Sequence, residues 1–133
     1  MANLTLDDAR RVSAAAEKKA TELGVAATVT IVDSGGYVRT QNRMDGARFG
    51  TVSVSTSKAF TAVAIGAPTG VLTGLTQPGQ EIFGYADAAA GRIAIFGGGS
   101  PLVRDGEIVG AIGISGGSVQ QDEAMAEAGV AAL

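Results

Sequence analysis

Apolar and polar positions divide the chain into long helix-forming runs and shorter runs in which β-branched residues alternate with others. The run from Leu6 to Leu23 predicts a first helix. Thr5 and Asp8 form a capping-box pattern at its start, and Gly24 stands in the position of a C-cap at its end. Both ends of the first helix can therefore be predicted to within a residue or two.

Five shorter runs predict β-strands. They are rich in apolar and β-branched residues, and turn-forming segments such as Ser34-Gly35-Gly36 and Asp105-Gly106 join them into hairpins. The last strand is apolar or small on both faces, which predicts a place in the middle of a sheet covered on both sides. The predicted strands cover residues 26–32, 37–41, 92–96, 101–104 and 107–115.

A second helix is expected over about residues 47–66, and its composition is unusual. Between Phe49 and Gln80 the only ionisable side chain is Lys58. A helix on the surface of a monomer normally carries a charged outer face. Burial inside one large core is the alternative, but a chain of 133 residues does not easily wrap this helix, so we expect a second copy to cover it. Its stripe of small residues consists of Gly50, Ser53, Ser57, Thr61 and Ala64.

The order of the elements predicts the fold class. A connector with short helical pieces spans residues 68–91, and a second capping pattern at Ser118 and Gln121 precedes a final helix over residues 119–132. Runs of strands joined by hairpins indicate a mostly antiparallel sheet with helices packed on its faces. We therefore expect one α+β domain over residues 1–133, with a five-stranded sheet.

The composition excludes several classes of function. Without Cys or His, the chain has no disulfide, no Cys/His zinc site and no Ser-His-Asp or Cys-His catalytic arrangement. The acidic residues are scattered, so no metal site is expected. A net charge of −3 and the lack of a basic stripe argue against nucleic acid. With no leader and no apolar run that spans a bilayer, we expect no membrane partner and, by default, a cytoplasmic location.

Lys58 is the strongest candidate for a site residue. Most lysines are simply solvated, but this one stands alone in an uncharged stretch. A buried ammonium group pairs with an acid, such as Asp45 or Asp122, or loses its proton and becomes a usable base. Lys58 and Asp45 are therefore the candidate catalytic residues. Asp122 is a candidate ligand-binding residue, and its alternative role is to favour the N-terminus of the last helix.

Two loops supply further candidates. The glycines at 97–99 offer backbone N–H groups to a carboxylate or another anion, or they simply permit a tight turn. Arg43, Met44 and Asp45 lie between a strand and a helix, where loops often carry function, although Asp45 has the alternative role of helix cap. The candidate ligand-binding residues are Arg43, Met44, Thr61, Gly97, Gly98, Gly99 and Asp122.

Several segments match one pattern in their joint order and spacing, from Leu6 to about Ala128. They are Val32-Asp33-Ser34-Gly35-Gly36, Arg43-Met44-Asp45-Gly46-Ala47, Ser57-Lys58-Ala59, Pro68-Thr69, Phe96-Gly97-Gly98-Gly99 with Pro101-Leu102, and the stretch from Asp105 to Gly117 followed by Gln121-Asp122. Together they resemble the GlcG/HbpS family, which is also found as the C-terminal domain of PduO proteins. The resemblance implies a profilin-like, five-stranded antiparallel sheet, and dimers that assemble into larger rings, often octamers.

The resemblance also implies a function. Members are associated with haem binding or degradation, with glycolate and diol utilisation, and with corrinoid metabolism. Haem-binding relatives tend to use a His as axial ligand, and this chain has none. Met44, Met125, Tyr85 or Lys58 would have to replace it, and the sequence selects none of them.

We therefore expect a homo-oligomeric small-molecule-binding protein whose ligand is haem or a small carboxylate or carbonyl metabolite. Its pocket is expected near a subunit interface, beside the second helix, the glycine turn and the Met44 loop. One alternative is a cofactor-independent isomerase, hydratase or lyase, in which Lys58 or Asp45 moves a proton while glycine N–H groups hold the substrate. Another is an accessory subunit of a pathway enzyme.

Overall fold

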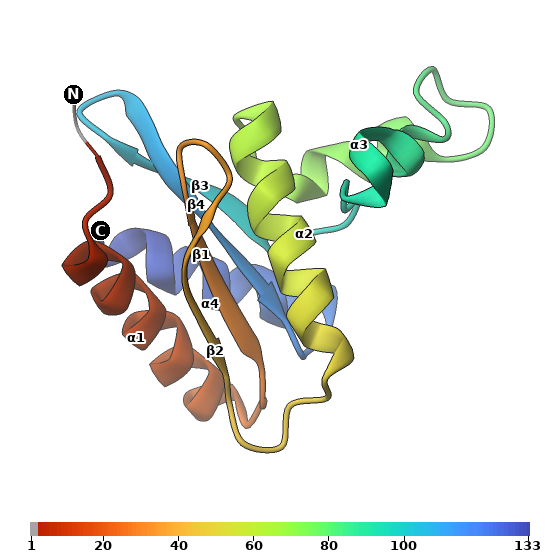
Figure 1. Cartoon of the computed structure of the whole chain (residues 1–133). Coiled ribbons are helices and arrows are strands. Elements are labelled where there is room, and N and C mark those ends of the chain that lie inside the picture. Colours follow the sequence, from red (N-terminus) through yellow and green to blue (C-terminus); the bar gives the residue numbers. More distant parts are fainter. Residues whose placement is uncertain (1–2) are drawn as a thin grey trace.

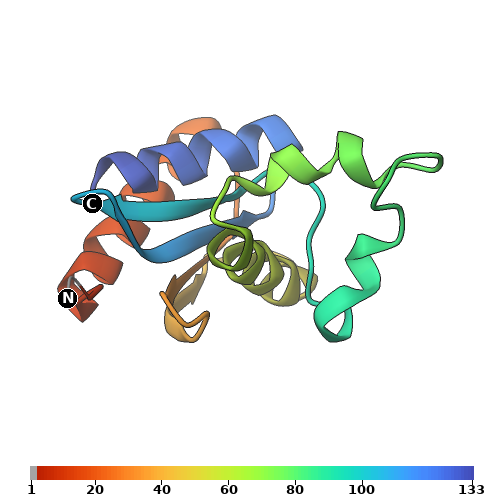
Figure 2. The same cartoon turned by 90° about the horizontal axis from the view of Figure 1, so that it is seen from above.

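The computed structural model describes residues 3–133 (Figure 1), which form an antiparallel sheet between two layers of helices. Two helices lie on one face of the sheet and one on the other (Figure 2). The first face carries α1 (Leu6–Leu23) and α4 (Val119–Ala131), and the second carries α2 (Gly50–Ile65). The strands are β1 (Thr28–Asp33), β2 (Val38–Arg43), β3 (Gly99–Arg104) and β4 (Glu107–Ser115).

The strand order is β2-β1-β4-β3, and all neighbouring strands are antiparallel. β4 is an inner strand with helices on both of its faces, as its apolar sequence predicts. On one face, a Cβ atom at Gly113 would overlap the carbonyl oxygen of Ser55, so α2 packs backbone against backbone on the sheet. On the other face, Ile112 packs against Gly129 of α4. Gly113 of β4 and Gly129 of α4 thus set how closely the helices approach the sheet.

The prediction of five strands is wrong, because residues 92–96 form no strand and the sheet of the described residues has four. The segment is extended, but side-chain hydroxyls replace the backbone partners of a sheet. The backbone N–H of Ala94 donates to Thr61 Oγ1 (2.9 Å), and Thr69 Oγ1 donates to the carbonyl of Phe96 (2.8 Å). Thr73 Oγ1 likewise donates to the carbonyl of Ile95 (2.7 Å). These bonds hold the segment across α2 and away from the sheet edge.

The predicted caps of the first and last helices and the predicted turn at Asp105-Gly106 are confirmed. Both capping boxes form, and Gly24 ends α1 in the left-handed conformation. Asp105 and Gly106 both have positive φ, as a two-residue hairpin turn between β3 and β4 requires. The second helix begins at Gly50, later than expected, and Phe49 is its N-cap with no side-chain hydrogen bond. Asp45 is therefore not a helix cap.

The two helical layers pack on the sheet in different ways. On the α1 and α4 face, aliphatic side chains such as Ile31, Ile112 and Met125 form the main core. On the α2 face, hydroxyls meet directly: Thr28 Oγ1 lies 2.7 Å from Thr51 Oγ1, and Thr30 Oγ1 lies 2.8 Å from Ser55 Oγ. A smaller apolar cluster completes this face and consists of Val32, Ala59, Ala62 and Ala111.

The outer face of α2 is only partly covered by the chain itself. Thr61 is buried beneath residues 92–94, and Ser57 is half-buried. Gly50, Ser53 and Ala64 of the small-residue stripe are exposed. Of the five residues in the stripe, the chain itself therefore fully buries only Thr61. That a second copy covers the other four residues stays a prediction.

The connector between α2 and β3 extends away from the sheet (Figures 1 and 2). It contains η1 (Thr69–Leu72), η2 (Gly74–Thr76), η3 (Tyr85–Asp87) and α3 (Ala88–Gly91). No single helix of the described chain is long and apolar enough to cross a bilayer. The only combination that passes by length and composition is α2 with Thr69–Thr76, and that pair is bent by 80°.

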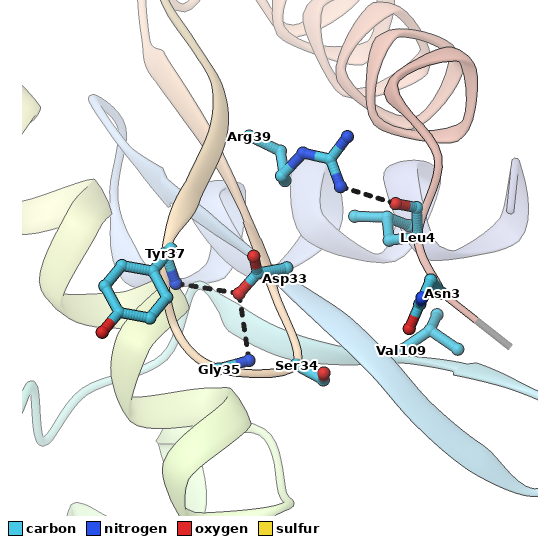
Figure 3. Close-up of a pocket in the computed structure, with 8 residues that line it drawn as sticks. All are labelled: Asn3, Leu4, Asp33, Ser34, Gly35, Tyr37, Arg39 and Val109. Carbon is cyan, nitrogen blue, oxygen red and sulfur yellow. Dashed lines mark hydrogen bonds between the residues drawn. The ribbon is translucent and has the colours of Figure 1, made fainter. Parts of the chain in front are cut away.

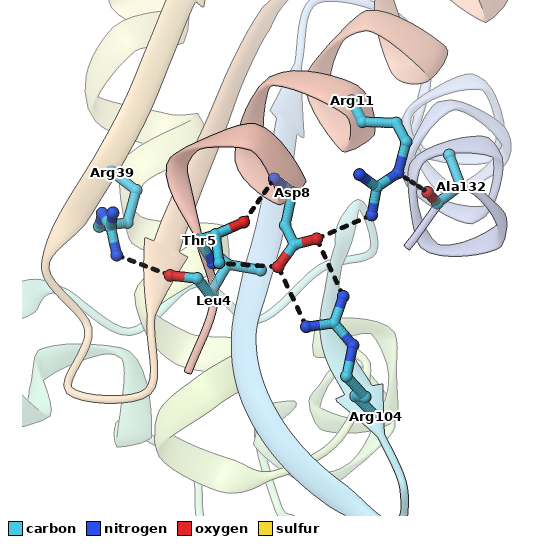
Figure 4. A network of polar contacts seen from close by, with 7 residues as sticks. All are labelled: Leu4, Thr5, Asp8, Arg11, Arg39, Arg104 and Ala132. Carbon is cyan, nitrogen blue, oxygen red and sulfur yellow. Dashed lines mark hydrogen bonds and ion pairs between the residues drawn. The ribbon is translucent and has the colours of Figure 1, made fainter. Parts of the chain in front are cut away.

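Asp8 joins three elements near the start of the chain (Figure 4). Its carboxylate accepts two hydrogen bonds from Arg104 of β3, at 3.0 and 2.9 Å, and one from Arg11 at 2.8 Å. Arg11 also donates to the carbonyl of Ala132, just beyond α4. These partners hold the pKa of Asp8 far below its ordinary value, with the bond to Arg104 as the largest cause.

Candidate functional site

Lys58 lies inside the protein, with 1 % of its surface exposed. Its Nζ donates to Asp122 Oδ2 at 2.9 Å and to the carbonyl of Ile114 at 2.8 Å, and it lies 5.0 Å from the centre of the Phe96 ring. Of the two acids considered from the sequence, Asp122 is thus the partner. Burial lowers the pKa of Lys58, while the hydrogen bond and charge of Asp122 oppose this shift.

The pair of Lys58 and Asp122 connects α2 to α4. The second oxygen of Asp122 accepts the backbone N–H of Gly117 at 2.9 Å, so both carboxylate oxygens are used. A substrate cannot reach either charged group in this arrangement, since both side chains are at least nine-tenths buried. The geometry therefore favours a structural ion pair that fixes the position of the turn above it.

That turn is formed by Gly97, Gly98 and Gly99, which pack against buried charged groups. A Cβ atom at Gly98 would lie 2.7 Å from Lys58 Nζ, and one at Gly97 would lie 2.6 Å from the carboxyl carbon of Glu123. Gly98 also has a φ of +119°. Because the carboxylate of Glu123 already lies against the turn, an incoming anion would be repelled there. The geometry favours the tight-turn interpretation of these glycines over an anion site.

Three threonines fix the segment that leads into this turn. Thr61, a candidate from the sequence, receives the N–H of Ala94 and is fully buried. Thr69 and Thr73, which the sequence interpretation did not select, donate to the carbonyls of residues 96 and 95. Thr69 also accepts the N–H of Gly99 at 3.0 Å. The signal in the sequence was the recurrence of threonine at steps of eight and four residues in a stretch with few other polar groups.

An apolar groove lies between α2 and this segment, with a volume of about 200 Å³. A smaller pocket of about 80 Å³ shares Ser57 with it and contains Phe60 and Arg92. The Arg92 guanidinium lies 4.0 Å above the Phe60 ring, and its Nε donates to the carbonyl of Ala89. The charge of Arg92 is therefore held in this adjoining pocket and not in the groove itself. We call this site the α2 groove, and its lining residues are Ser53, Val54, Ser57, Ile93, Ala94 and Phe96.

The Met44 loop lies elsewhere. The N–H of Met44 donates to the carbonyl of Ala27 at the start of β1, and its side chain packs against the main core. Asp45 is exposed and makes no ion pair within residues 3–133. Lys58 is eight residues into α2, about 12 Å along its axis from Gly50. The structure brings Lys58, Asp122, Thr61 and the glycine turn together, but not Arg43, Met44 or Asp45.

The α2 groove suits the face of a flat apolar ring but does not provide an iron ligand. Haem iron is held in proteins by His, Cys, Met or Tyr side chains, and the residues that line the groove are of other types. Met125 is fully buried and Lys58 is paired, so neither reaches a bound ring. Tyr85 is half-buried but does not line the groove. Axial ligation of haem iron therefore does not fit this groove. Within residues 3–133, no three carboxylates gather to hold a metal ion.

Comparison with known protein families and sequences places these features in context. The sequence model of a family described as "Haem degrading protein HbpS-like" matches residues 4–131. An uncharacterised 15.0 kDa protein from the dhaT-dhaS intergenic region of Citrobacter freundii is 39% identical over 96% of this chain and 89% of its own length. The corrinoid adenosyltransferase PduO of the same organism is 37% identical over 98% of this chain. The chain matches only 39% of the length of that PduO.

Solved structures agree with the sequence comparison. PduOC in complex with haem has a TM-score of 0.95 and 37% identity, over 99% of this chain and 96% of that one. HbpS has a TM-score of 0.89 and 32% identity, over 100% of this chain and 92% of that one. The fold is thus shared with these proteins over nearly the whole chain.

Proposed function

The chain belongs to the HbpS-like family, and from this premise we propose that it is a homo-oligomeric small-molecule-binding protein whose ligand occupies the α2 groove. The ligand is a flat, largely apolar molecule with a carboxylate or carbonyl edge, a class that includes haem. The crystal structure of PduOC with haem supports this class by similarity. The observation that carries the proposal is the apolar groove together with the arginine that Phe60 holds in the adjoining pocket.

The chemistry of the groove matches this ligand. Ile93 and Ala94 form a buried floor, and the half-exposed ring of Phe96 offers a surface for stacking. At the adjoining pocket, Arg92 is held by Phe60 and by a backbone carbonyl, so its guanidinium is available to a carboxylate without further ordering. Apolar contact would hold the ring, and Arg92 would orient its polar edge.

The size of the groove supports an oligomer. Pockets that enclose a ligand usually measure about 300–1,000 Å³, and this groove measures about 200 Å³. A second copy on the outer face of α2 would supply the missing wall and would cover Phe49, which is 83% exposed. Leu75 and Phe83 of the connector are also exposed and would extend the same interface. We expect dimers that assemble into a larger ring, with eight copies as the expected number.

Titration with haem and with metal-free protoporphyrin IX tests the ligand. Both are expected to give a saturable Soret shift with similar affinity, because the groove contacts the ring and not the iron. Val54→Asp places a charge in the groove and is expected to weaken both by about tenfold or more. Val103→Asp, at a partly exposed valine of β3, is the matched control and should bind normally. If neither compound gives a saturable shift, the ligand class is wrong, and if only haem does, iron ligation controls binding.

Light scattering at micromolar concentration tests the assembly separately. The wild type is expected to have the molar mass of an assembly of several chains. Ser53→Arg adds a long charged side chain to the exposed stripe and is expected to lower this molar mass. Arg10→Glu, on the exposed face of α1, serves as the control. A stable monomer would contradict the oligomer and, with it, the completed groove.

A further inference from the structure

A second pocket, of about 280 Å³, lies beside the turn between β1 and β2 (Figure 3). It shares no lining residue with the α2 groove. Its lining includes one cation, one anion and two buried aliphatic residues. We call it the hairpin pocket, and it is lined by Asn3, Leu4, Asp33, Ser34, Gly35, Tyr37, Arg39 and Val109.

The carboxylate of Asp33 is held in one orientation by the turn. Its Oδ1 accepts the backbone N–H groups of Gly35 and Tyr37, each at 3.0 Å. This is the Asx-type bonding that the sequence predicts for Asp33. The other oxygen, Oδ2, makes no hydrogen bond to any residue from 3 to 133. The turn therefore presents one fixed carboxylate oxygen that is available to a ligand.

The guanidinium of Arg39 is fixed in a similar way. Its Nη1 donates to the carbonyl of Leu4 at 2.7 Å, and its Nε and Nη2 have no acceptor within the described part of the chain. Arg39 and Asp33 lie on either side of the space between the hairpin and Leu4 (Figure 3). Arg39 and Asp33 form no ion pair, because the guanidinium nitrogens and the carboxylate oxygens lie more than 4.0 Å apart. Two opposite charges thus line one pocket without forming a direct ion pair.

We propose that the hairpin pocket binds a small zwitterion, namely an α-amino acid with an aliphatic side chain. The ligand's carboxylate bonds to Nε and Nη2 of Arg39, a geometry that suits a guanidinium. Its ammonium group bonds to Oδ2 of Asp33. Leu4 and Val109 line the pocket and give it a small apolar patch for the side chain. The volume is just below the range of about 300–1,000 Å³ for pockets that hold larger ligands, which limits the ligand to a small molecule.

Calorimetric titration with L-leucine and two single-charge analogues tests the zwitterion. The analogues are 4-methylpentanoate, which lacks the ammonium group, and 3-methylbutylamine, which lacks the carboxylate. Leucine is expected to bind with a dissociation constant on the order of 1 mM or lower. Each analogue is expected to bind about tenfold or more weakly, because one charged group of the pocket is left unpaired. No heat of binding at about 10 mM leucine, or equal binding of all three compounds, would overturn the proposal.

Two variants locate the site. Asp33→Asn keeps an oxygen for the turn and removes the charge, and Arg39→Gln removes the guanidinium, so each should weaken leucine binding about tenfold or more. Arg10→Gln and Asp105→Asn remove the same charges at the surface and should leave binding unchanged. Thermal unfolding shows whether each variant folds. Normal binding by folded Asp33→Asn and Arg39→Gln proteins would refute the assignment, as would amide NMR shifts centred on the α2 groove.

Discussion

Replacing Asp8 with Asn tests how strongly one carboxylate stabilises the fold. Asn keeps an oxygen that can accept the N–H of Thr5 in the capping box, so the change removes mainly the charge. The side chain of Asp8 is 9% exposed, whereas those of Arg104 and Arg11 are 31% and 50% exposed. Removing one partner of a fully buried pair costs about 3–5 kcal/mol. Because both arginines can return to water, we expect a smaller loss of about 2–3 kcal/mol in the free energy of unfolding at neutral pH.

The effect must depend on pH in a defined direction. The pKa of Asp8 is lower in the folded protein than its ordinary value of 3.8. Asp8 therefore contributes its full stabilisation above that ordinary value, and the contribution decreases as the pH falls below it. Urea unfolding of wild type and Asp8→Asn at pH 7, 5, 4 and 3 measures the difference. We expect a constant difference at the two higher pH values and a smaller one at pH 3.

Asp7→Asn is the matched control. Asp7 lies in the same helical turn, so it interacts with the same end of the helix dipole, but it is 91% exposed and lies 4.0 Å from Arg10. We expect it to change stability by less than about 0.5 kcal/mol at any pH. A loss in Asp8→Asn that is no larger than in Asp7→Asn, or one that persists unchanged at pH 3, would refute the role given to the Asp8 network.

Four further substitutions probe packing and strain, each measured by chemical denaturation. Lys58→Met leaves Asp122 buried without its partner and should cost about 3–5 kcal/mol, and a loss below 1 kcal/mol would show that the pair is solvated. Thr40→Val removes a buried hydroxyl that has no partner among residues 3–133 and should stabilise by about 1 kcal/mol, whereas a loss would indicate a hidden hydrogen bond. Ala90→Gly relieves a φ of +59° and should stabilise by about 0.5–1 kcal/mol, unless the left-handed turn is absent in solution. Gly113→Ala forces α2 away from the sheet and should cost about 3 kcal/mol, and a neutral result would mean that the helix is free to shift.

Local sequence signals account for most of the fold. The caps at Thr5, Gly24 and Ser118 and the turn at Asp105-Gly106 are short-range features, and all of them form as predicted. The segment at 92–96 shows the limit of this approach. Its run of apolar residues fits a strand, but whether a strand forms depends on distant hydrogen-bond partners. Here three threonines, 20 or more residues away in the chain, provide them instead of a neighbouring strand.

The sequence predicts the candidate site only where a buried charged group requires a partner of opposite charge. An isolated Lys58 in an uncharged stretch was expected to pair with an acid or to lose its proton, and Asp122 was one of the two acids considered. The Met44 loop, by contrast, was placed in the pocket because of its position between two elements, and that position does not determine its distance from Lys58. Arg92 was missed because its proposed role depends on the ring of Phe60, which lies about a quarter of the chain away in sequence.

The unusual composition of α2 has a physical explanation in the structure. A surface helix normally turns its apolar side chains inward and its polar ones outward. On the inner face of α2, Thr51 and Ser55 form hydrogen bonds with hydroxyls of β1. The outer face carries Val54, which lines the groove, and the exposed Phe49 immediately precedes the helix. An uncharged outer face of this kind is typical of a surface that a partner or a ligand covers. The proposed oligomer and the proposed ligand groove would therefore both follow from the composition of α2.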